Sequence, residues 1–309
     1  MLIYIAGIRG MVGSAIAEEA IAQGHEVVGT DSKNLDFTNR SEVFSEILNV
    51  RPEVLVIAAA KVGGIGANSS LPVDFLSLNL QIQTNLLDAA HQANVEKVLF
   101  LGSSCIYPKY SVQPIPEAAL LTGVFEPTNE PYAIAKIAGL KLVEAYRKQY
   151  NHKWISAMPT NLYGPRDNFD LKTAHVLPAL LNRFHEAKVS NLDEVKIWGD
   201  GTPLREFLHV KDLALACLML INKYDDKVAI NVGSGEEIAI LDLAQKISKV
   251  IGFKGSINFD LSKPNGTPRK LLDSSAINTL GWKAHIDIES GLASTYNWFL
   301  SHEAKGKMR

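Results

Sequence analysis

Short apolar runs alternate with amphipathic segments along the first half of the chain. The apolar runs predict buried strands at 2–6, 26–30, 54–60, 97–103 and 154–160. The segments between them predict helices at 12–23, 41–50, 75–93 and 132–150. Strands that are apolar throughout, with helices between them, are typical of a parallel sheet covered on both faces. The pattern therefore predicts an α/β fold with a Rossmann doubly wound parallel sheet, whose ligands bind at the carboxyl ends of the strands.

The alternation stops after Pro165. A polar loop and a helix at 175–188 follow, and a short strand lies at 195–203. A strand and a helix return at 207–221, and another strand at 228–235. We therefore predict two interleaved domains. The Rossmann domain occupies 1–165, with 206–235 returning to it, and a smaller α/β C-terminal substrate domain occupies 166–205 and 236–309.

Length, charge and cysteine count exclude a few classes of protein but do not identify the function. The 309 residues exceed one ordinary domain, and a net charge of −2 does not suggest a nucleic-acid partner or an acidic membrane. The two cysteines, Cys105 and Cys217, cannot form a disulfide framework and fit a reducing compartment. The chain opens on a strand without a basic leader segment, and no apolar run approaches the roughly 20 residues that a membrane span needs. We expect a soluble cytoplasmic protein without a metal site.

Glycines recur at every third position where the first strand meets the first helix. Gly7, Gly10 and Gly13 form the pattern G-x-x-G-x-x-G. Such glycines permit a tight turn and a close approach of the backbone to a pyrophosphate, which the helix N-terminus favours. The alternative is a structural turn in a fold that binds no nucleotide. We expect a dinucleotide to contact the whole loop, which comprises Gly7, Ile8, Arg9, Gly10, Met11, Val12 and Gly13.

Two residues near this loop give opposite signals about the dinucleotide. Arg9 could reach the 2′-phosphate of NADP, whereas Asp31 follows the second strand, where an acidic residue usually accepts from the 2′-hydroxyl of NAD. Lys33 could offset the charge of Asp31, and the choice stays open on these residues alone. Asp36 is a candidate for binding the adenine amine, and a capping role is the alternative.

Tyr132 and Lys136 share one face at the start of a predicted helix. An ammonium beside a phenol favours the phenolate, so we expect the pKa of Tyr132 to fall from about 10 toward neutrality. Such a tyrosine can pass a proton to a carbonyl oxygen as hydride arrives at carbon. A solvated helix face is the usual explanation of an isolated pair, but Ser103 at a polar strand end and the glycine loop favour catalysis.

Six segments, in order over nearly the whole chain, resemble the extended short-chain dehydrogenase/reductase family: GIRGMVGSAI, AAAKVGGI, FLGSSCIYPK, EPTNEPYAIAKIAG, MPTNLYGP and GTPRKLLD. The resemblance implies an enzyme that uses NADP(H). It further implies that the substrate is a GDP-4-keto-6-deoxy sugar, namely GDP-4-keto-6-deoxy-D-mannose. This sugar would be epimerised at C3 and C5 and reduced at C4 to GDP-L-fucose.

The resemblance also implies roles around the tyrosine. Ser103 would hydrogen-bond the C4 carbonyl, Tyr132 would protonate it, and Lys136 would bind the nicotinamide ribose and lower the tyrosine pKa. Asn79 would support this site from a neighbouring helix. The cofactor contacts beyond the glycine loop would be Asp36, Leu101, Gly102, Ser103, Ser104, Lys136, Pro159, Thr160, Asn161, Leu162 and His175.

Cys105 follows Ser103 by two residues, where the strand end turns polar. Epimerisation beside a ketone needs a base on one face of the sugar and an acid on the other, whereas a simple reductase needs neither. The resemblance implies that Cys105 is the base and His175 the acid. From the residues alone, His175 is equally well explained as a helix N-terminal histidine of no special role. Cys217 lies in an unbroken apolar helix, and we expect it to be an inert buried thiol.

A GDP group needs cations for its diphosphate and a flat surface for a ring. The resemblance assigns Arg183, Trp198 and Arg205 to the substrate. Lys270 is a weaker substrate candidate, because a basic loop is usually just solvated. His209 is expected to be structural.

Three other functions are compatible with some of these residues. A sugar-nucleotide 4,6-dehydratase would share the fold, but it would carry an Asp-Glu pair where this chain has Ser104 and Cys105. A relative that epimerises only C5 of a 3-deoxy GDP-sugar could keep every residue named above. A catalytically silent NADP-binding regulator is disfavoured by the intact set of catalytic candidates, and a turnover assay would decide it.

Family members commonly pair through the helix of the Tyr-Lys motif and the long helix before it. The resemblance therefore implies a homodimer formed by the helices at 75–93 and 132–150. The apolar residues that we expect in this interface are Leu78, Leu86, Leu87, Leu140 and Val143.

Overall fold

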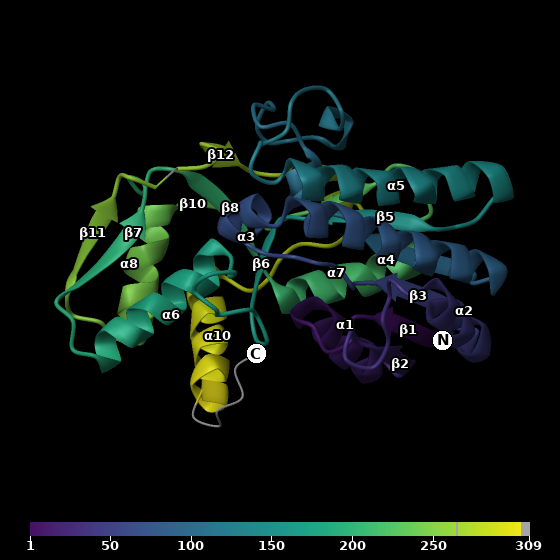
Figure 1. Ribbon diagram of the computed structural model, residues 1–309, viewed down its shortest axis with the longest axis horizontal. Coiled ribbons are helices and arrows are strands. Elements are labelled where there is room, and N and C mark those ends of the chain that lie inside the picture. Colours follow the sequence, from purple (N-terminus) through teal and green to yellow (C-terminus); the bar gives the residue numbers. More distant parts are fainter. Residues whose placement is uncertain (264, 304–309) are drawn as a thin grey trace.

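The computed structural model describes residues 1–263 and 265–303, and a parallel sheet forms its larger lobe (Figure 1). Its strands are β1 (Leu2–Ala6), β2 (Glu26–Thr30), β3 (Val54–Ile57), β4 (Lys97–Leu101), β5 (Ile155–Pro159) and β9 (Ile230–Val232). They lie in the order β2-β1-β3-β4-β5-β9, and every neighbouring pair is parallel. The predicted parallel sheet is confirmed. Because the chain turns to opposite sides of β1 to form β2 and β3, a crevice for a ligand is expected at the carboxyl end of β1.

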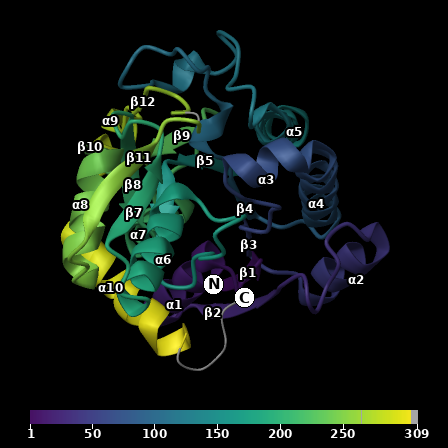
Figure 2. The ribbon, with the colours of Figure 1, turned by 60° about the vertical axis from the view of Figure 1, so that its left-hand side comes forward.

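Helices cover both faces of this sheet. One face carries α2 (Arg40–Val50), α4 (Pro72–Gln92) and α5 (Glu130–Tyr150), and the other carries α1 (Met11–Ala22), α7 (Val210–Lys223) and α9 (Ser275–Thr279). Successive residues of a strand point to opposite faces of the sheet. Tyr4 of β1 packs in the core on the face with α2, α4 and α5, and Ile3 and Ile5 pack in the core on the face with α1, α7 and α9. Figures 1 and 2 show α4 and α5 lying side by side along the first face. The doubly wound fold class is therefore confirmed.

The residues predicted to form a dimer interface pack elsewhere. Leu86, Leu87, Leu140 and Val143 are fully buried in the core between the helices and the sheet, so their assignment to an interface is wrong. The reason is that a helix lying on a sheet needs its apolar stripe for that sheet. Leu78 is only half-buried.

The exposed apolar residues of these two helices are a different set. On α4, Val73 is 73% exposed, and on α5, Ile134 and Tyr150 are 42% and 48% exposed. The outer sides of the helices thus retain some apolar surface that the sheet does not cover.

The smaller lobe is built of three helices and two short sheets, at the left in Figure 1. The helices are α6 (Val176–Val189), α8 (Ile240–Ile251) and α10 (Ile288–Glu303). One sheet has the order β10 (Glu237–Ala239), β8 (Leu204–His209) and β12 (Arg269–Lys270), with β6 (Asn161–Tyr163) also paired to β8. The other pairs β7 (Glu194–Trp198) with β11 (Ser256–Asp260). Phe184, Leu243 and Leu292 lie in the core of this lobe.

The chain passes between the lobes more often than the sequence pattern suggests. Strand β8 pairs in the smaller lobe, but it leads directly into α7, which packs under the large sheet. Ile277 of α9 and Trp282 also pack under the large sheet, although they lie in the predicted second segment, 236–309. Residues 264 and 304–309 of that segment lie outside the described residues. The domain boundaries remain a prediction.

The remaining elements are short. They are α3 (Ile65–Ser70) and two 3₁₀ turns at Ser104–Ile106 and Glu117–Ala119. Among the described residues, no helix is both long enough and apolar enough to cross a membrane.

Candidate active site

The glycine loop has the close packing that its sequence predicts. Gly7 has φ +87°, and a Cβ there would lie 2.9 Å from the Ala59 nitrogen. A Cβ on Gly13 would lie 2.2 Å from the Gly7 carbonyl oxygen, so the first turn of α1 sits directly against the loop. The first helical hydrogen bond runs from Ser14 N–H to the Gly10 carbonyl at 2.9 Å. The N–H groups of Met11, Val12 and Gly13 at the start of α1 therefore lack helical acceptors and suit an anionic group, which fits a pyrophosphate.

Arg9 and Asp31, the two residues with conflicting signals, form an ion pair. Arg9 Nε lies 3.5 Å from Asp31 Oδ2, and the arginine side chain is 59% exposed while the aspartate side chain is 10% exposed. The other carboxylate oxygen accepts from Lys33 N–H at 3.1 Å and from Asn34 Nδ2 at 2.9 Å. The charge of Asp31 is thus offset by Arg9, whereas Lys33 contributes its backbone N–H.

Asp36 caps a turn. Its Oδ1 accepts from Thr38 N–H at 2.9 Å and from Thr38 Oγ1 at 2.7 Å, and these bonds lower the pKa of the carboxyl. The capping role that the sequence left open is present in the structure. A role toward adenine stays a prediction.

Ser103, Tyr132 and Lys136 lie together at the carboxyl end of β4. A side-chain hydrogen bond links Tyr132 to Ser103. Lys136 Nζ donates to the Leu101 carbonyl at 2.8 Å and lies 5.9 Å from the centre of the Tyr132 ring. Lys136 is only 4% exposed, and this burial lowers its pKa to about 8. The strand end and the first turn of α5 therefore form one polar cluster.

The pKa of Tyr132 is raised, not lowered. Burial is the main cause, the nearby Cys105 adds to it, and the hydrogen bond with Ser103 opposes it. The predicted shift toward neutrality is wrong for this structure, because burial of the phenol has the largest effect and Lys136 gives its hydrogen bond to the Leu101 carbonyl. A phenol that keeps its proton at neutral pH is suited to donate one.

Asn79 hydrogen-bonds the backbone of a segment that lies near Tyr132. Its Nδ2 donates to the Phe75 and Lys61 carbonyls at 2.7 and 3.0 Å, and its Oδ1 accepts from Lys61 N–H at 2.9 Å. Phe75 in turn meets the Tyr132 ring edge-on, with 6.2 Å between ring centres. Asn79 thus holds α4 to the loop after β3 and indirectly supports Tyr132.

The segment predicted to line the nicotinamide joins the two lobes. Pro159 ends β5, Thr160 N–H donates to the Val232 carbonyl at 3.1 Å, and Asn161 Nδ2 donates to the Glu206 carbonyl at 2.8 Å. Leu162 follows in β6. These residues therefore lie between the carboxyl edge of the large sheet and the smaller lobe.

Cys105 faces a cationic side chain from the smaller lobe. Lys270 Nζ lies 3.5 Å from Cys105 Sγ, and Arg205 and Tyr132 are also close enough to interact with the thiol electrostatically. The thiol is partly exposed. Lys270 was predicted as a substrate residue, and the structure places it beside the candidate base.

His175 precedes the first residue of α6 and lies close enough to Lys270 for the lysine charge to affect it. The residue is accessible to solvent, yet the protein around it lowers its pKa, and the Lys270 charge lowers it further. A lowered pKa makes the protonated imidazole a stronger acid, which suits a group that returns a proton. The structure thus brings Cys105, Lys270 and His175 into one electrostatic group.

The other predicted substrate residues lie around β7 and β8. Arg183 Nη1 donates to the Lys196 carbonyl at 2.6 Å, and burial lowers the pKa of its guanidinium. Trp198 is 45% exposed, with Lys263 Nζ 5.6 Å from its ring centre. Arg205 Nη1 donates to the Leu204 carbonyl at 2.8 Å. Each of these three predicted side chains retains surface or donors that a nucleotide could use.

His209 and Cys217 have the structural roles expected of them. His209 Nδ1 accepts from Lys211 N–H at 3.3 Å at the start of α7, and its Nε2 lies 3.2 Å from Ser294 Oγ. Cys217 is fully buried, and burial raises the pKa of its thiol to about 12. Neither is placed for acid–base chemistry.

The sequence interpretation missed two carboxyl groups whose pKa is raised in the structure. Glu206 is fully buried and accepts from Gly235 N–H at 2.8 Å and Leu272 N–H at 3.0 Å, which ties together the loops around Asn161. Burial raises the pKa of Asp167 to about 7. The sequence carries a signal for Glu206, which directly precedes the apolar residues Phe207 and Leu208, and none for Asp167.

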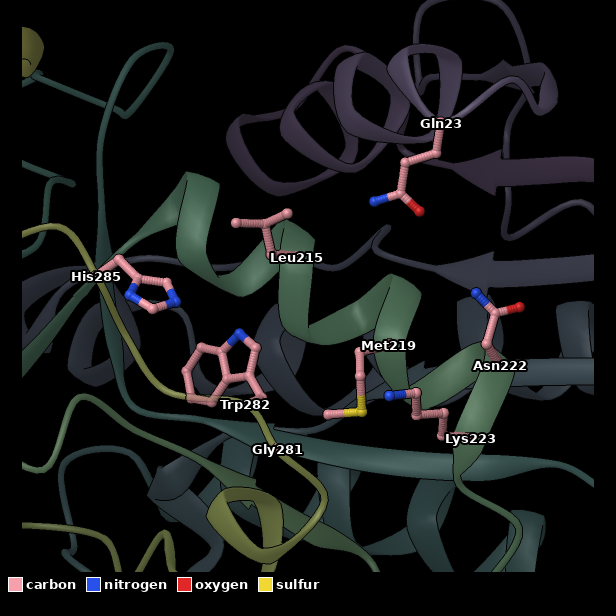
Figure 3. A pocket seen from close by; sticks show the side chains of 8 residues that line it. All are labelled: Gln23, Leu215, Met219, Asn222, Lys223, Gly281, Trp282 and His285. Carbon is pink, nitrogen blue, oxygen red and sulfur yellow. The ribbon is translucent and has the colours of Figure 1, made fainter.

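A separate hollow of about 340 Å³ lies between α1, α7 and the segment after α9 (Figure 3). Leu215 and Met219 of α7 face Trp282 and His285 across it. It contains none of the predicted catalytic, cofactor or substrate residues. The candidate active site therefore lies at the carboxyl edge of the sheet and not here.

Comparisons with known proteins agree with this arrangement. The chain matches the model of the NAD dependent epimerase/dehydratase family over residues 3–233. It is 53% identical to GDP-L-fucose synthase 1 of Arabidopsis thaliana, over 97% of this chain and 93% of that protein. It is 39% identical to GDP-L-colitose synthase of Yersinia pseudotuberculosis, over 98% of this chain and 99% of that protein.

A solved structure has the same fold over almost its whole length. It is a GDP-L-fucose synthetase from Naegleria fowleri bound to NADP, with a TM-score of 0.91 and 27% identity, covering 98% of this chain and 95% of that one. The chain therefore belongs to the NAD dependent epimerase/dehydratase family, within the extended short-chain dehydrogenases/reductases that its motifs predict.

Proposed function

We propose that this chain epimerises GDP-4-keto-6-deoxy-D-mannose at C3 and C5 and reduces it at C4 to GDP-L-fucose, with NADPH as the reductant. The observation that carries the proposal is the position of Cys105. The thiol lies beside Tyr132 of the candidate reduction centre and 3.5 Å from the ammonium of Lys270. A reductase alone needs only Ser103, Tyr132 and Lys136, whereas a second acid–base pair is needed to invert carbons beside the ketone.

Two stages follow from these groups. Hydrogens beside a ketone are acidic because the resulting charge spreads onto the carbonyl oxygen. Cys105 removes such a proton from one face, and His175 returns one to the other face, at C3 and at C5. Ser103 then holds the C4 carbonyl oxygen, and Tyr132 gives it a proton. NADPH, when bound by the glycine loop and Lys136, supplies hydride to C4.

Residues of the smaller lobe bind the substrate. Arg183 and Arg205 offer guanidinium groups to the diphosphate, and the exposed face of Trp198 offers a surface for a ring. Lys270 is close enough to the thiol to contact the sugar as well.

Product identification tests the function. The protein is incubated with GDP-4-keto-6-deoxy-D-mannose and NADPH, and the sugar product is identified by NMR. GDP-L-fucose is the expected product, and consumption of NADPH without a sugar product would contradict the proposal. A parallel incubation with the 3-deoxy substrate tests the second candidate, GDP-L-colitose synthesis, which the 39% identical relative supports. The higher identity to a GDP-L-fucose synthase favours the first candidate.

Asp31 should limit the preference for NADPH. Asp31→Asn keeps an oxygen that can accept from Lys33 N–H, removes the charge that repels a 2′-phosphate and releases Arg9 from its ion pair. We expect the ratio of kcat/KM for NADPH to that for NADH to rise about three- to tenfold, as removal of roughly 1 kcal/mol of repulsion implies. Asp225→Asn, which breaks a surface pair with Arg147, is the control and should leave the ratio unchanged. An unchanged ratio for Asp31→Asn would contradict the prediction.

We also propose a cytoplasmic homodimer. The apolar residues left exposed on α4 and α5, including Val73 and Ile134, support pairing through the outer sides of these helices. Two free thiols support a reducing compartment. A monomer in light scattering at micromolar concentration, or recovery outside the cytosolic fraction, would contradict the respective part of this proposal.

A further inference from the structure

Lys270 makes a contact that substrate binding does not explain. Its Nζ lies 3.5 Å from Cys105 Sγ, within the hydrogen-bond range of sulfur, although the two residues are 165 positions apart. We propose that Lys270 is a positioning residue that holds Cys105 as a thiolate, and so prepares it as the base of epimerisation. This inference rests on the proposed function.

Strand geometry explains why Lys270 reaches the thiol. Strand β12 pairs in parallel with β8, with Arg269 opposite Leu204 and Lys270 opposite Arg205. Successive residues of a strand point to opposite faces. Arg269 Nε accordingly lies 2.8 Å from Glu237 Oε2 on one face, while Lys270 reaches Cys105 on the other. The strand pairing therefore gives Lys270 a fixed direction that a solvated loop would not.

Titratable and charged groups from three elements face the thiol. Tyr132 from α5, Arg205 from β8 and Lys270 from β12 face Cys105, and His175 faces Lys270 from the head of α6. Among the described residues, Lys270 forms no ion pair with a carboxylate, so its charge is not offset. Two cations close to a sulfur stabilise the thiolate.

A nearby acid partly offsets the charge of Arg205. Glu126 interacts electrostatically with Arg205, and it is itself paired with Lys109 at 2.7 Å. Arg205 thus shares its charge with a carboxylate, whereas Lys270 acts on Cys105 and on His175.

An ionised thiol is what proton abstraction requires. In the step, the thiolate lone pair forms an S–H bond as the C–H bond at C3 or C5 breaks, and the bonding electrons pass to the enolate oxygen. Charge is conserved, because the negative charge moves from sulfur to the sugar. An ordinary thiol, with a pKa of about 8.5, is only a few per cent ionised at pH 7. Lys270 raises that fraction before substrate arrives.

Alkylation of Cys105 tests the inference without substrate. The full-length protein is treated with iodoacetamide between pH 5 and 10, and the rate at Cys105 is read from its peptide by mass spectrometry. The midpoint of the rate profile reports thiolate formation. In Lys270→Met it should move upward by about one pH unit or more, which slows alkylation at pH 7 about tenfold. Lys270→Arg keeps a cation and should retain most of the wild-type profile.

Arg269→Met is the matched control, because it removes the neighbouring cation of the same strand that points away from Cys105. It should leave the midpoint in place. Should Lys270→Met not fold, as judged by circular dichroism, Lys270→Gln replaces it as the neutral variant.

The outcomes separate this inference from the proposed function. An unchanged midpoint in the neutral variant would overturn the inference, and lost activity with that unchanged midpoint would make Lys270 a substrate contact. A shifted midpoint in a protein that forms no GDP-L-fucose would support the lysine–cysteine contact while refuting the proposed function. A shift in Arg269→Met equal to that in Lys270→Met would also overturn the inference, since it would indicate a general charge effect.

Discussion

Replacing Cys105 with serine should stop exchange of the C3 and C5 protons with solvent while reduction continues. A hydroxyl ionises far less readily than a thiol, so the base is lost at neutral pH. Ser103, Tyr132 and Lys136 remain, and the 4-keto group of the unepimerised sugar can still be reduced. We expect exchange to fall at least about 100-fold and the product to become a GDP-6-deoxy-D-sugar in place of GDP-L-fucose.

Deuterium uptake from heavy water into the sugar measures this effect directly. Cys217→Ser is the control, because that thiol is fully buried in α7, in the core between this helix and the large sheet. It should lower stability and leave both uptake and product unchanged. Normal uptake by Cys105→Ser would remove Cys105 from the role of base.

The fold of the larger lobe could be predicted because each of its elements is recognisable from a short stretch of sequence. Strands such as β3 and β4 are apolar runs that are buried on both faces. The smaller lobe was harder, because strands such as β11 (Ser256–Asp260) have largely exposed residues and leave no apolar run. Their pairing partners lie far away in the sequence, and only the folded chain brings them together.

Some features of the candidate site could likewise be predicted from the sequence, and others could not. The glycine loop and the Tyr132–Lys136 pair are local patterns, and a reader of the sequence can find them. The contacts between Arg9 and Asp31 and between Cys105 and Lys270 join distant segments, and no pattern indicates them.

The pKa of Tyr132 was predicted in the wrong direction for a physical reason. The sequence shows that an ammonium is near the phenol. It does not show how deeply the phenol is buried or which acceptor the ammonium hydrogen-bonds. Burial raises the pKa, and Lys136 is engaged with the Leu101 carbonyl. The assignment of apolar helix residues to a dimer interface was wrong for a similar reason. An apolar stripe on a helix shows that this face is covered, but it does not show whether a sheet or a partner subunit covers it.

Tyr132→Phe should give the opposite result to Cys105→Ser. The change removes only the hydroxyl that protonates the C4 oxygen, so the product alkoxide has no positioned acid. Reduction should fall about 10²- to 10⁴-fold, the usual contribution of a positioned acid. Exchange at C3 and C5 should continue, because Cys105 and His175 are untouched and the substrate keeps its ketone longer.

NADPH oxidation at 340 nm and deuterium uptake are measured in the same reaction. Tyr4→Phe is the matched control: it makes the same chemical change at another tyrosine whose pKa is raised by burial, but its hydroxyl bonds Thr30 and Glu46 at the second strand and α2. It should keep both activities. If Tyr132→Phe lost exchange together with reduction, a single group would serve both stages, and the division of labour between Tyr132 and Cys105 would be wrong. If reduction continued at the normal rate, a proton donor other than Tyr132 would have to reach the C4 oxygen. Ser103 would then be the group to replace next, because it is the hydroxyl that Tyr132 itself hydrogen-bonds.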